Sequence, residues 1–427
     1  MALRPCLCLV SLRHSGAAVA MSSFPFTIQE HTIEASHIRE YARATSHSQD
    51  EKLYLHIKQY TPKDNTAPQK GDVTIIGGHA NGFPKHGKAK VDSSTKTRLA
   101  MIVKLTIPSP NLTHANVLTA SWLDYARDIL HMINTFRPPP PIMAMGHSFG
   151  ANALTNVALL HPRIFTSLVL LDPVISHFAS TPGASSAGPA AASMVRREVW
   201  PSRAEAAASF GRSAFYKTWD PRVLQRWIDF GIRNIPGQES VTLTTTKHQE
   251  IFTFLRPSWP AYDPQGKDII HPEHTPDLDT SLNRRWSTYP VYRPEGPNTV
   301  ARLPNVRPSV LYVFGGKSNV SPLELQDEKM AVTGTGVGGS GGEAHGRVKK
   351  VVGENNGHLV PMEDPRMCAS AAADWIEAEL KRWWVDERSY EEWSSKSKED
   401  KTTVSDEFQK YIGKPAPRPG KGTKAKL

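Results

Sequence analysis

The segment Gly146-His147-Ser148-Phe149-Gly150 has the spacing G-x-S-x-G. In this pattern the two glycines allow a turn that is tight enough to expose the hydroxyl of the central serine between a strand and a helix. The flanking residues provide that context, because 142–146 indicates a buried strand and 151–160 a helix. Backbone N–H groups at the start of the helix would face the charge that develops on an attacked carbonyl oxygen. The pattern therefore predicts that Ser148 is a nucleophile in acyl transfer.

A serine nucleophile requires a general base, and His358 has the expected position. It lies in Gly357-His358-Leu359, after the last predicted strand at 347–352 and ahead of a predicted helix. In folds built on this serine pattern, the order along the chain is nucleophile, acid and then histidine. We therefore expect the imidazole of His358 to accept the proton of Ser148.

The third member of such a triad, an acid, is defined less sharply. In this architecture the acid usually follows the strand after an inserted cap, here 310–314, but the loop at 315–319 contains no carboxylate. Asp172 lies directly at the end of the strand that follows the nucleophile helix, and an acid can reach the histidine from there. Asp172 is the favoured acid, and Glu324 and Asp327 remain alternatives.

The oxygen of a tetrahedral intermediate needs N–H donors as well. One donor is expected from Phe149, which directly follows the nucleophile. The other is expected from the turn at 81–84, which follows the predicted strand at 72–79. Phe83 is the favoured donor in this turn, because the preceding glycine permits close approach and Pro84 has no N–H.

These residues have to be positioned by a fold in which strands and helices alternate. Strands are predicted at 72–79, 142–146, 166–171, 309–314 and 347–352, and helices at 121–136, 151–160 and 368–384. Such alternation predicts an α/β architecture, a mostly parallel sheet with helices on both faces. The alternation stops at 173–308, where prolines and aromatic residues are frequent. We expect a hydrolase core at 22–172 and 309–390 and an inserted, largely helical cap at 173–308.

The composition excludes several classes of function. Of 427 residues, 39% are hydrophobic and 22% charged, as in soluble globular proteins, and no apolar run is long enough to span a membrane. The net charge is 51 − 41 = +10, but residues 396–427 hold nine Lys/Arg and four Asp/Glu, a balance of +5. Nucleic-acid binding needs basic residues clustered on a folded face, so we do not expect this protein to bind nucleic acid. Three cysteines, Cys6, Cys8 and Cys368, indicate a reducing compartment.

Both ends of the chain differ from the core. Residues 1–21 form an N-terminal extension, interpreted either as a start placed too early, with Met21 the true beginning, or as a targeting segment. Residues 391–427 are polar and basic, and we expect a flexible tail. The tail ends in Ala425-Lys426-Leu427, a tripeptide similar to the peroxisomal signal S-K-L. It predicts a location in the peroxisomal matrix and an import receptor as a partner.

No cofactor or metal is expected. Gly334-Thr-Gly336-Val-Gly-Gly339 fits the dinucleotide pattern G-x-G-x-x-G, but it neither follows a predicted strand nor begins a predicted helix. His271 and His274 have no third ligand at a suitable spacing. Serine acyl transfer itself needs neither group.

Several of these segments together resemble the fungal peroxisomal α/β-hydrolases, which include hydrolases encoded with host-selective toxin pathways and the yeast peroxisomal lipase. The resemblance rests on the serine turn, on 79–85 (His-Ala-Asn-Gly-Phe-Pro-Lys), on 200–205 and 215–222 in the cap, and on 357–363. It covers about residues 22–384. It implies the α/β-hydrolase fold and a hydrolase of lipid-derived or toxin metabolism, and it assigns Ser148 and His358 by position.

The segment 86–120 departs from that family. It is rich in Lys, Ser and Thr and lacks the family's pattern of a helix and a strand. Our hypothesis is a fault in the gene model, and the sequence then predicts that a strand beside the serine turn is missing.

The sequence thus predicts a peroxisomal serine hydrolase of the esterase, lipase or thioesterase type. Its small-molecule substrate would be an acyl ester or thioester from lipid-derived or secondary, toxin-related metabolism. One alternative is an acyltransferase on the same fold, in which an alcohol or amine replaces water. The other is an inactive binding protein, which the atypical segment and the missing acid after the cap would explain.

Overall fold

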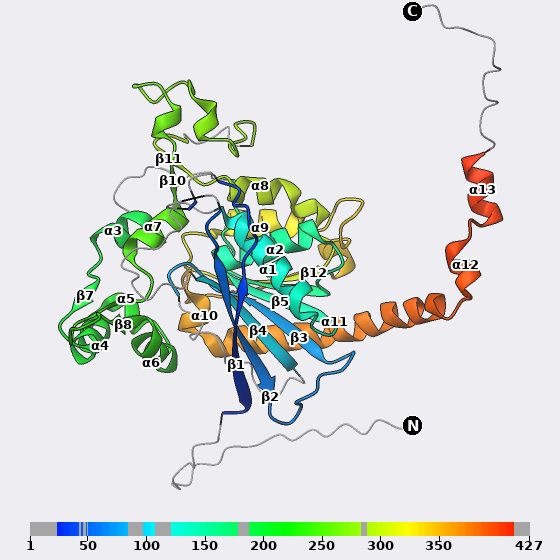
Figure 1. The fold of residues 1–427 in the computed structure, drawn as a ribbon, viewed down its shortest axis with the longest axis horizontal. Helices are drawn as coiled ribbons and strands as arrows, with labels where there is room; N and C mark the ends of the chain where they lie inside the picture. Colours follow the sequence, from blue (N-terminus) through cyan, green and yellow to red (C-terminus); the bar gives the residue numbers. More distant parts are fainter. Residues whose placement is uncertain are drawn as a thin grey trace, which may run out of the picture.

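The computed structural model describes residues 24–41, 44–45, 48, 50–83, 97–106, 121–177, 188–282 and 288–413. At its centre is an eight-stranded sheet with the order β1-β2-β4-β3-β5-β6-β12-β13 (Figure 1). The strands are β1 (Phe26–Glu34), β2 (Tyr54–Pro62), β3 (Val73–Gly78), β4 (Thr97–Thr106), β5 (Ile142–His147), β6 (Ser167–Leu171), β12 (Ser309–Gly315) and β13 (Val348–Gly353). β2 pairs antiparallel with both neighbours, and all other neighbouring strands are parallel.

Helices cover both faces of this sheet, which confirms the expected α/β fold class. One face carries α1 (Trp122–Phe136), α2 (Phe149–Leu160), α8 (Glu295–Arg302) and α9 (Leu323–Val332), and the other carries α11 (Pro365–Ser394). Side chains of β6 and β12 alternate between the faces, as strand geometry requires. Leu168, Leu170, Val310 and Tyr312 pack into the cluster with α1 and α2, whereas Val169, Leu171, Leu311 and Val313 pack with Trp375 of α11.

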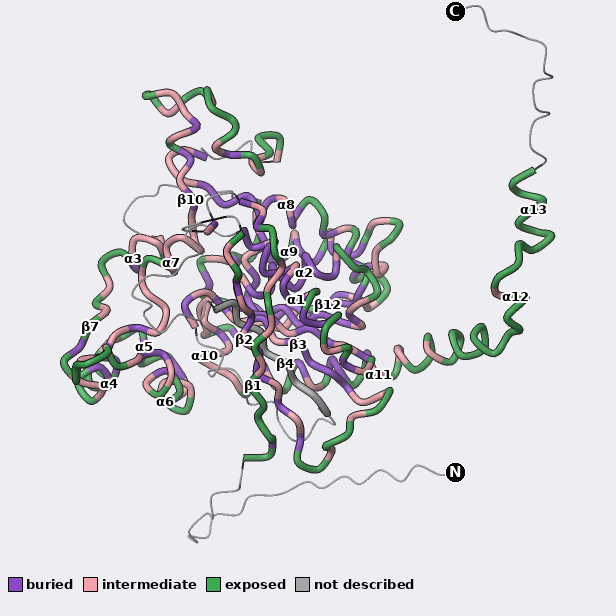
Figure 2. Tube along the Cα trace, viewed as in Figure 1, coloured by how far each residue is buried: buried purple, intermediate pink, exposed green. Residues whose placement is uncertain are grey.

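The cap is inserted between β6 and β12 and has its own apolar core (Figure 2). It contains α3 (Pro189–Val195), α4 (Arg203–Arg212), α5 (Ala214–Lys217), α6 (Pro221–Phe230), α7 (Lys247–Phe254), η1 (Trp259–Ala261) and η2 (Pro272–His274). Short strands join these helices, in a sheet of β7 (Val199–Trp200), β9 (Val241–Leu243) and β8 (Ile232–Asn234) and a pair of β10 (Arg256–Pro257) and β11 (Val291–Tyr292).

The end of the insertion differs from the expected boundary at 308. The helix α8 and the turn η3 (Leu303–Asn305) place Val300, Leu303 and Val306 in the main core cluster beside α2. These residues are therefore part of the core layer.

The segment 86–120 contains a strand after all, so the prediction of a missing strand is wrong. β4 lies between β2 and β3, parallel to β3 and antiparallel to β2. The rest of this segment lies outside the described residues, as do 1–23 and the tripeptide at 425–427.

Residues beyond the core continue as helix rather than as an irregular tail. After η4 (Glu343–His345) and α10 (Val360–Glu363), α11 extends to Ser394, and α12 (Lys398–Thr402) and α13 (Asp406–Ile412) follow it away from the core (Figure 1). The flexibility expected for 391–427 stays a prediction. Within the described part of the chain, no helix combines the length and the apolarity that crossing a bilayer demands.

Candidate active site

Ser148 lies in the sharp turn between β5 and α2, at the carboxyl ends of the parallel strands. Its backbone has φ 59° and ψ −124°, a conformation that residues with a Cβ rarely adopt. The two glycines of the pattern are required by packing. A Cβ on Gly146 would lie 2.7 Å from the Cα of Ala151, and one on Gly150 would lie 2.5 Å from the carbonyl oxygen of His79. The spacing thus produces the strained turn that the sequence predicted.

His358 reaches this turn from the loop after β13. Its Nε2 lies 2.9 Å from the Oγ of Ser148. Two contacts hold the loop: the N–H of Gly357 donates to Glu363 at 2.7 Å, and the Nε2 of His147 donates to the carbonyl oxygen of His358 at 2.8 Å. The sequence analysis gave His147 no role, because the residue before the serine varies in this motif and carries no signature.

Asp172 completes the chain of contacts. It follows β6 with φ 37°, is fully buried, and its Oδ2 lies 2.6 Å from the Nδ1 of His358. Its own N–H donates to the carbonyl oxygen of Val313 at 2.8 Å, which ties it to β12. The other two carboxylates considered, Glu324 and Asp327, lie on exposed positions of α9, and Asp327 pairs with Lys350 at 2.5 Å. Of the three carboxylates, the structure brings only Asp172 into contact with His358.

A serine that the sequence analysis passed over also contacts the acid. The Oγ of Ser318, in the loop after β12, donates to the Oδ2 of Asp172 at 2.6 Å. The Oγ of Ser318 also accepts the N–H groups of Val320 and Ser321, at 3.2 and 3.3 Å. A hydroxyl in a glycine-rich loop gives no signal in the sequence comparable to that of a carboxylate.

The two expected N–H donors differ in their surroundings. Phe149 is the first residue of α2, so its N–H has no acceptor within the helix. The N–H of Phe83 donates to the carbonyl oxygen of Ala80 at 3.3 Å, and it would have to exchange this partner for a substrate oxygen. The ring of Phe83 packs against Trp219 and Trp227 of the cap, with centroids 5.7 and 5.6 Å apart. The turn after β3 is therefore held from the cap side.

Cap helix α7 fixes the same turn through Glu250. The side chain of Asn81 donates to the carbonyl oxygen of Glu250 at 2.9 Å. Gly82 has φ 79°, and a Cβ there would lie 2.4 Å from the Oε1 of Glu250. The carboxylate of Glu250 is buried and accepts from Arg196 and Ser193 at 2.7 and 2.9 Å. Thus the donor turn and the cap form one packed unit.

A buried lysine on α9, Lys329, interacts electrostatically with Asp172. Lys329 of α9 is 2% exposed, its Nζ donates to the carbonyl oxygen of Leu325 at 3.2 Å, and it lies 6.0 Å from the ring centre of Phe314. Burial lowers the pKa of Lys329 to about 8, although the negative charges of Asp172 and Glu328 oppose this shift.

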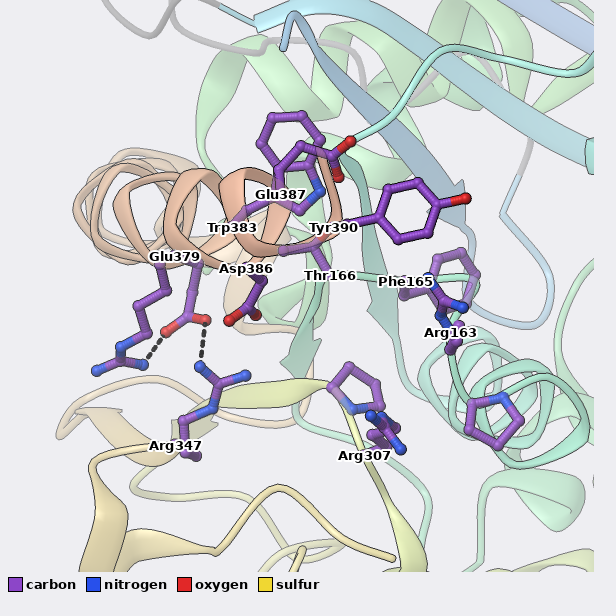
Figure 3. A pocket seen from close by; sticks show the side chains of 13 residues that line it. Arg163, Phe165, Thr166, Arg307, Arg347, Glu379, Trp383, Asp386, Glu387 and Tyr390 are labelled. Carbon is purple, nitrogen blue, oxygen red and sulfur yellow. Dashed lines mark hydrogen bonds and ion pairs between the residues drawn. The ribbon is translucent and has the colours of Figure 1, made fainter. Parts of the chain in front are cut away.

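A pocket of about 440 Å³ lies at the other end of the sheet (Figure 3). Thr166, Pro308 and Arg347, which line it, immediately precede β6, β12 and β13. The nucleophile turn follows the carboxyl end of β5, so the strands separate this pocket from Ser148. At its base the buried Glu379 pairs with Arg347 and Arg382. The glycine-rich segment 334–339 also precedes β13 and follows α9, so it does not have the strand-to-helix context of a dinucleotide site.

Comparisons with known proteins agree with this geometry. The model of the Alpha/beta hydrolase family matches residues 83–371. Type I acyl-CoA thioesterase mpaH of Penicillium brevicompactum is 35% identical over 407 residues, covering 87% of this chain and 92% of that protein. Abhydrolase domain-containing protein AFT2-1 of Alternaria alternata is 28% identical over 246 residues, covering 56% of this chain and 83% of that protein.

Among solved structures, the peroxisomal α/β-hydrolase Lpx1 of Saccharomyces cerevisiae matches with a TM-score of 0.62 at 15% identity, covering 90% of this chain and all of that one (100%). At this identity the match shows the fold alone. Together with the fungal relatives, it confirms the resemblance that the sequence indicated.

Proposed function

This chain belongs to the α/β-hydrolase family and is a hydrolase, and on that premise we propose that it hydrolyses acyl thioesters of coenzyme A through an acyl-enzyme on Ser148. The observation that carries the proposal is the continuous pair of hydrogen bonds from Ser148 to His358, at 2.9 Å, and from His358 to Asp172, at 2.6 Å. A hydroxyl alone is a weak nucleophile at neutral pH, and this arrangement is the means by which serine hydrolases activate it.

The proposed reaction has two halves. In the first, the Oγ of Ser148 attacks the thioester carbonyl carbon while the Nε2 of His358 takes the hydroxyl proton. The N–H groups of Phe149 and Phe83 are the proposed donors to the oxyanion, and collapse of the intermediate breaks the carbon–sulfur bond and releases coenzyme A as the thiol, with the proton from His358. In the second half, His358 deprotonates a water that attacks the acyl carbon, the bond from that carbon to the Oγ of Ser148 breaks, and His358 returns the proton to Oγ as the free acid leaves. Asp172 orients the imidazole throughout.

Two observations support a thioester of secondary metabolism as the substrate class. The relative of highest identity reported above bears the name of an acyl-CoA thioesterase, and it aligns along 92% of its own length. The aromatic core of the cap, which includes Trp219, packs against Phe83 of the donor turn and against Leu359 beside His358. An apolar cap next to the proposed nucleophile suits an acyl group with a large apolar body.

The test is release of coenzyme A from a panel of acyl-CoA thioesters by the purified full chain, followed with a thiol reagent. The panel should contain straight-chain acyl groups of increasing length and acyl groups with aromatic rings. We expect Ser148→Ala to lower kcat by about 10³-fold or more, whereas Ser394→Ala, at the exposed end of α11, should leave it unchanged. If Ser148→Ala kept its activity, the proposal would be wrong. Addition of alcohols to the reaction separates hydrolysis, which yields the acid, from acyl transfer, which yields an ester.

We also propose a location in the peroxisomal matrix, delivered by an import receptor. The support is the terminal tripeptide Ala425-Lys426-Leu427, in which a small residue, a basic residue and leucine follow the order of S-K-L.

A further inference from the structure

The loop after β12 presents an unusual arrangement for a serine hydrolase of this architecture. This loop normally supplies the acid, and here it contains Ser318 in place of a carboxylate. The acid contact to His358 comes from Asp172 at the end of β6 instead. Ser318 nevertheless contacts the acid. Its hydroxyl donates to the Oδ2 of Asp172, the oxygen that also contacts the imidazole of His358.

The carboxylate of Asp172 is demanding to bury. It is 0% exposed, and among the described residues its Oδ1 has no hydrogen-bond partner, so its polar contacts all fall on Oδ2. A buried carboxylate without compensation tends to take up a proton. The hydroxyl of Ser318 is a neutral donor to Oδ2 at 2.6 Å, and its oxygen already accepts the N–H groups of Val320 and Ser321. It therefore meets the carboxylate as a hydrogen-bond donor.

A second buried group lies on α9. Lys329 is 2% exposed, and its ammonium donates to the carbonyl oxygen of Leu325 in its own helix, at 3.2 Å. The ammonium lies over the ring of Phe314, which follows Val313, the residue to which the N–H of Asp172 donates. Burial lowers the pKa of Lys329 to about 8, and the negative charges of Asp172 and Glu328 oppose part of this lowering.

We propose that Ser318 and Lys329 are positioning residues of the active site, which hold the carboxylate of Asp172 in its orientation toward His358. This inference rests on the proposed triad. It assigns a role to the loop after β12, which has no acid of its own: through Ser318 this loop contacts the carboxylate of Asp172.

The proposal has a consequence for the rate of the reaction. Asp172 contacts His358 and Ser318, and His358 also packs against His147. Loss of the Ser318 hydroxyl or of the Lys329 charge removes support from the carboxylate that orients the imidazole. Proton transfer at Nε2 then becomes slower while substrate binding is unaffected, so kcat should fall with KM nearly unchanged.

Three variants test this, with two matched controls. Ser318→Ala removes the donor, and its control is Ser321→Ala, a buried serine of the same loop whose Oγ has no partner among the described residues. Lys329→Met removes the buried lysine. Its control is Lys350→Met, which removes a lysine of β13 that pairs with Asp327, a residue of the same helix as Lys329. Ser318→Thr keeps the hydroxyl and serves as the rescue.

Two readouts are measured on the full chain. The first is the pair of constants kcat and KM, measured with p-nitrophenyl butyrate and with octanoyl-CoA. For Ser318→Ala and Lys329→Met we expect a fall of kcat at pH 7 on the order of 10-fold, with KM nearly unchanged. The second is the NMR signal of the Nδ1–H proton of His358, assigned with His358→Ala, which reports the hydrogen bond to Asp172 and requires no turnover. It should move in these two variants and not in the controls.

The outcomes distinguish the two proposals. Values of kcat and NMR signals of Ser318→Ala and Lys329→Met that coincide with those of their controls would overturn the positioning role, and wild-type activity would leave the hydrolase proposal standing. Wild-type protein that turns over neither substrate and does not react with a fluorophosphonate would refute the hydrolase proposal instead, while the NMR signal would still decide whether the two residues position His358. A wild-type kcat in Ser318→Thr supports the hydroxyl as the group responsible.

Discussion

The residue proposed as the nucleophile has a strained backbone conformation. Ser148 has φ 59° and ψ −124°, and such conformations cost residues with a Cβ on the order of 1–3 kcal/mol. Glycine adopts positive φ without this cost. We therefore expect Ser148→Gly to be more stable than Ser148→Ala by about 1 kcal/mol, seen as a higher midpoint of thermal unfolding, although both lack coenzyme A release.

The control for this comparison is a site with ordinary geometry. Thr218 has φ −77° and ψ −16°, in the right-handed helical region, and is exposed. There glycine should be no more stable than alanine, because it loses more backbone entropy on folding. If glycine stabilised both sites equally, or neither, strain at Ser148 would not be the cause.

At the residue scale, spacing was informative where a motif constrains the backbone. The turn around Ser148 and the position of His358 could be predicted because a strand, a strained turn and a chain order must coincide. Asp172 was favoured but not separable from Glu324 and Asp327 by sequence, since all three depend on which loop reaches the histidine. Ser318 could not be predicted, because serine in a glycine-rich loop is common and its role depends on a contact across 146 positions.

At the scale of single elements, helix α1 contains two buried carboxylates with opposite environments. Asp128 accepts from both Nη atoms of Arg39, at 2.8 and 3.3 Å, and from the N–H of Ser36 at 3.0 Å. Asp124 accepts from the N–H of Glu40 at 3.0 Å and from Arg127 at 3.2 Å, and its Oδ2 is buried without a partner among the described residues. Burial raises the pKa of Asp124 to about 6.

This shift has a definite sign. Folded protein binds the proton of Asp124 more tightly than the unfolded chain does, so the stability gained from the protonated form is lost as pH rises from about 4 to about 6. We expect Asp124→Asn to raise the free energy of unfolding at pH 7 by about 2 kcal/mol and to have little effect near pH 4. Thermal unfolding between pH 4 and 8 measures both.

The matched variant Asp128→Asn should behave in the opposite way. It leaves the guanidinium of Arg39, which is 4% exposed, without its carboxylate, and we expect a loss of about 3 kcal/mol at pH 7. Equal effects of the two substitutions at pH 7 would contradict the assignment of different environments to the two carboxylates.

Element prediction succeeded where hydrophobic periodicity was strong and failed where pairing decides. The buried strand β12 and helix α1 were predicted within a residue at each end, because their apolar residues recur with the period of the element. The strand β4 was missed: its segment looks unlike the family pattern, and its place in the sheet comes from pairing with β2 and β3, which lie elsewhere in the chain. The helices α12 and α13 were missed because a polar helix has no periodic apolar face.

At the scale of the whole molecule, the proposed active site and the proposed targeting signal lie in different parts of the chain. The site lies at the carboxyl ends of the parallel strands, where β5, β6 and β13 deliver Ser148, Asp172 and His358 to one edge. The positive charge concentrates at the other extreme, in the polar C-terminal residues that follow the core. α11 leads the chain away from the body, so that α12 and α13 lie clear of the sheet (Figure 1).

The helices α11 to α13 lead the chain away from the core as far as Gly413. This direction suits a receptor that binds the last residues and the terminal carboxylate. The chain should therefore enter peroxisomes when a fluorescent protein is fused to its N-terminus, and deletion of Leu427 should leave it in the cytosol, because the leucine side chain and the terminal carboxylate are what a receptor for S-K-L endings reads. Colocalisation with a peroxisomal marker in a filamentous fungus measures this. Ala425→Ser, which restores the consensus residue, is the matched control and should import at least as well. Import that persists without Leu427 would assign the address to another part of the chain, with the N-terminal segment 1–21 as the next segment to delete.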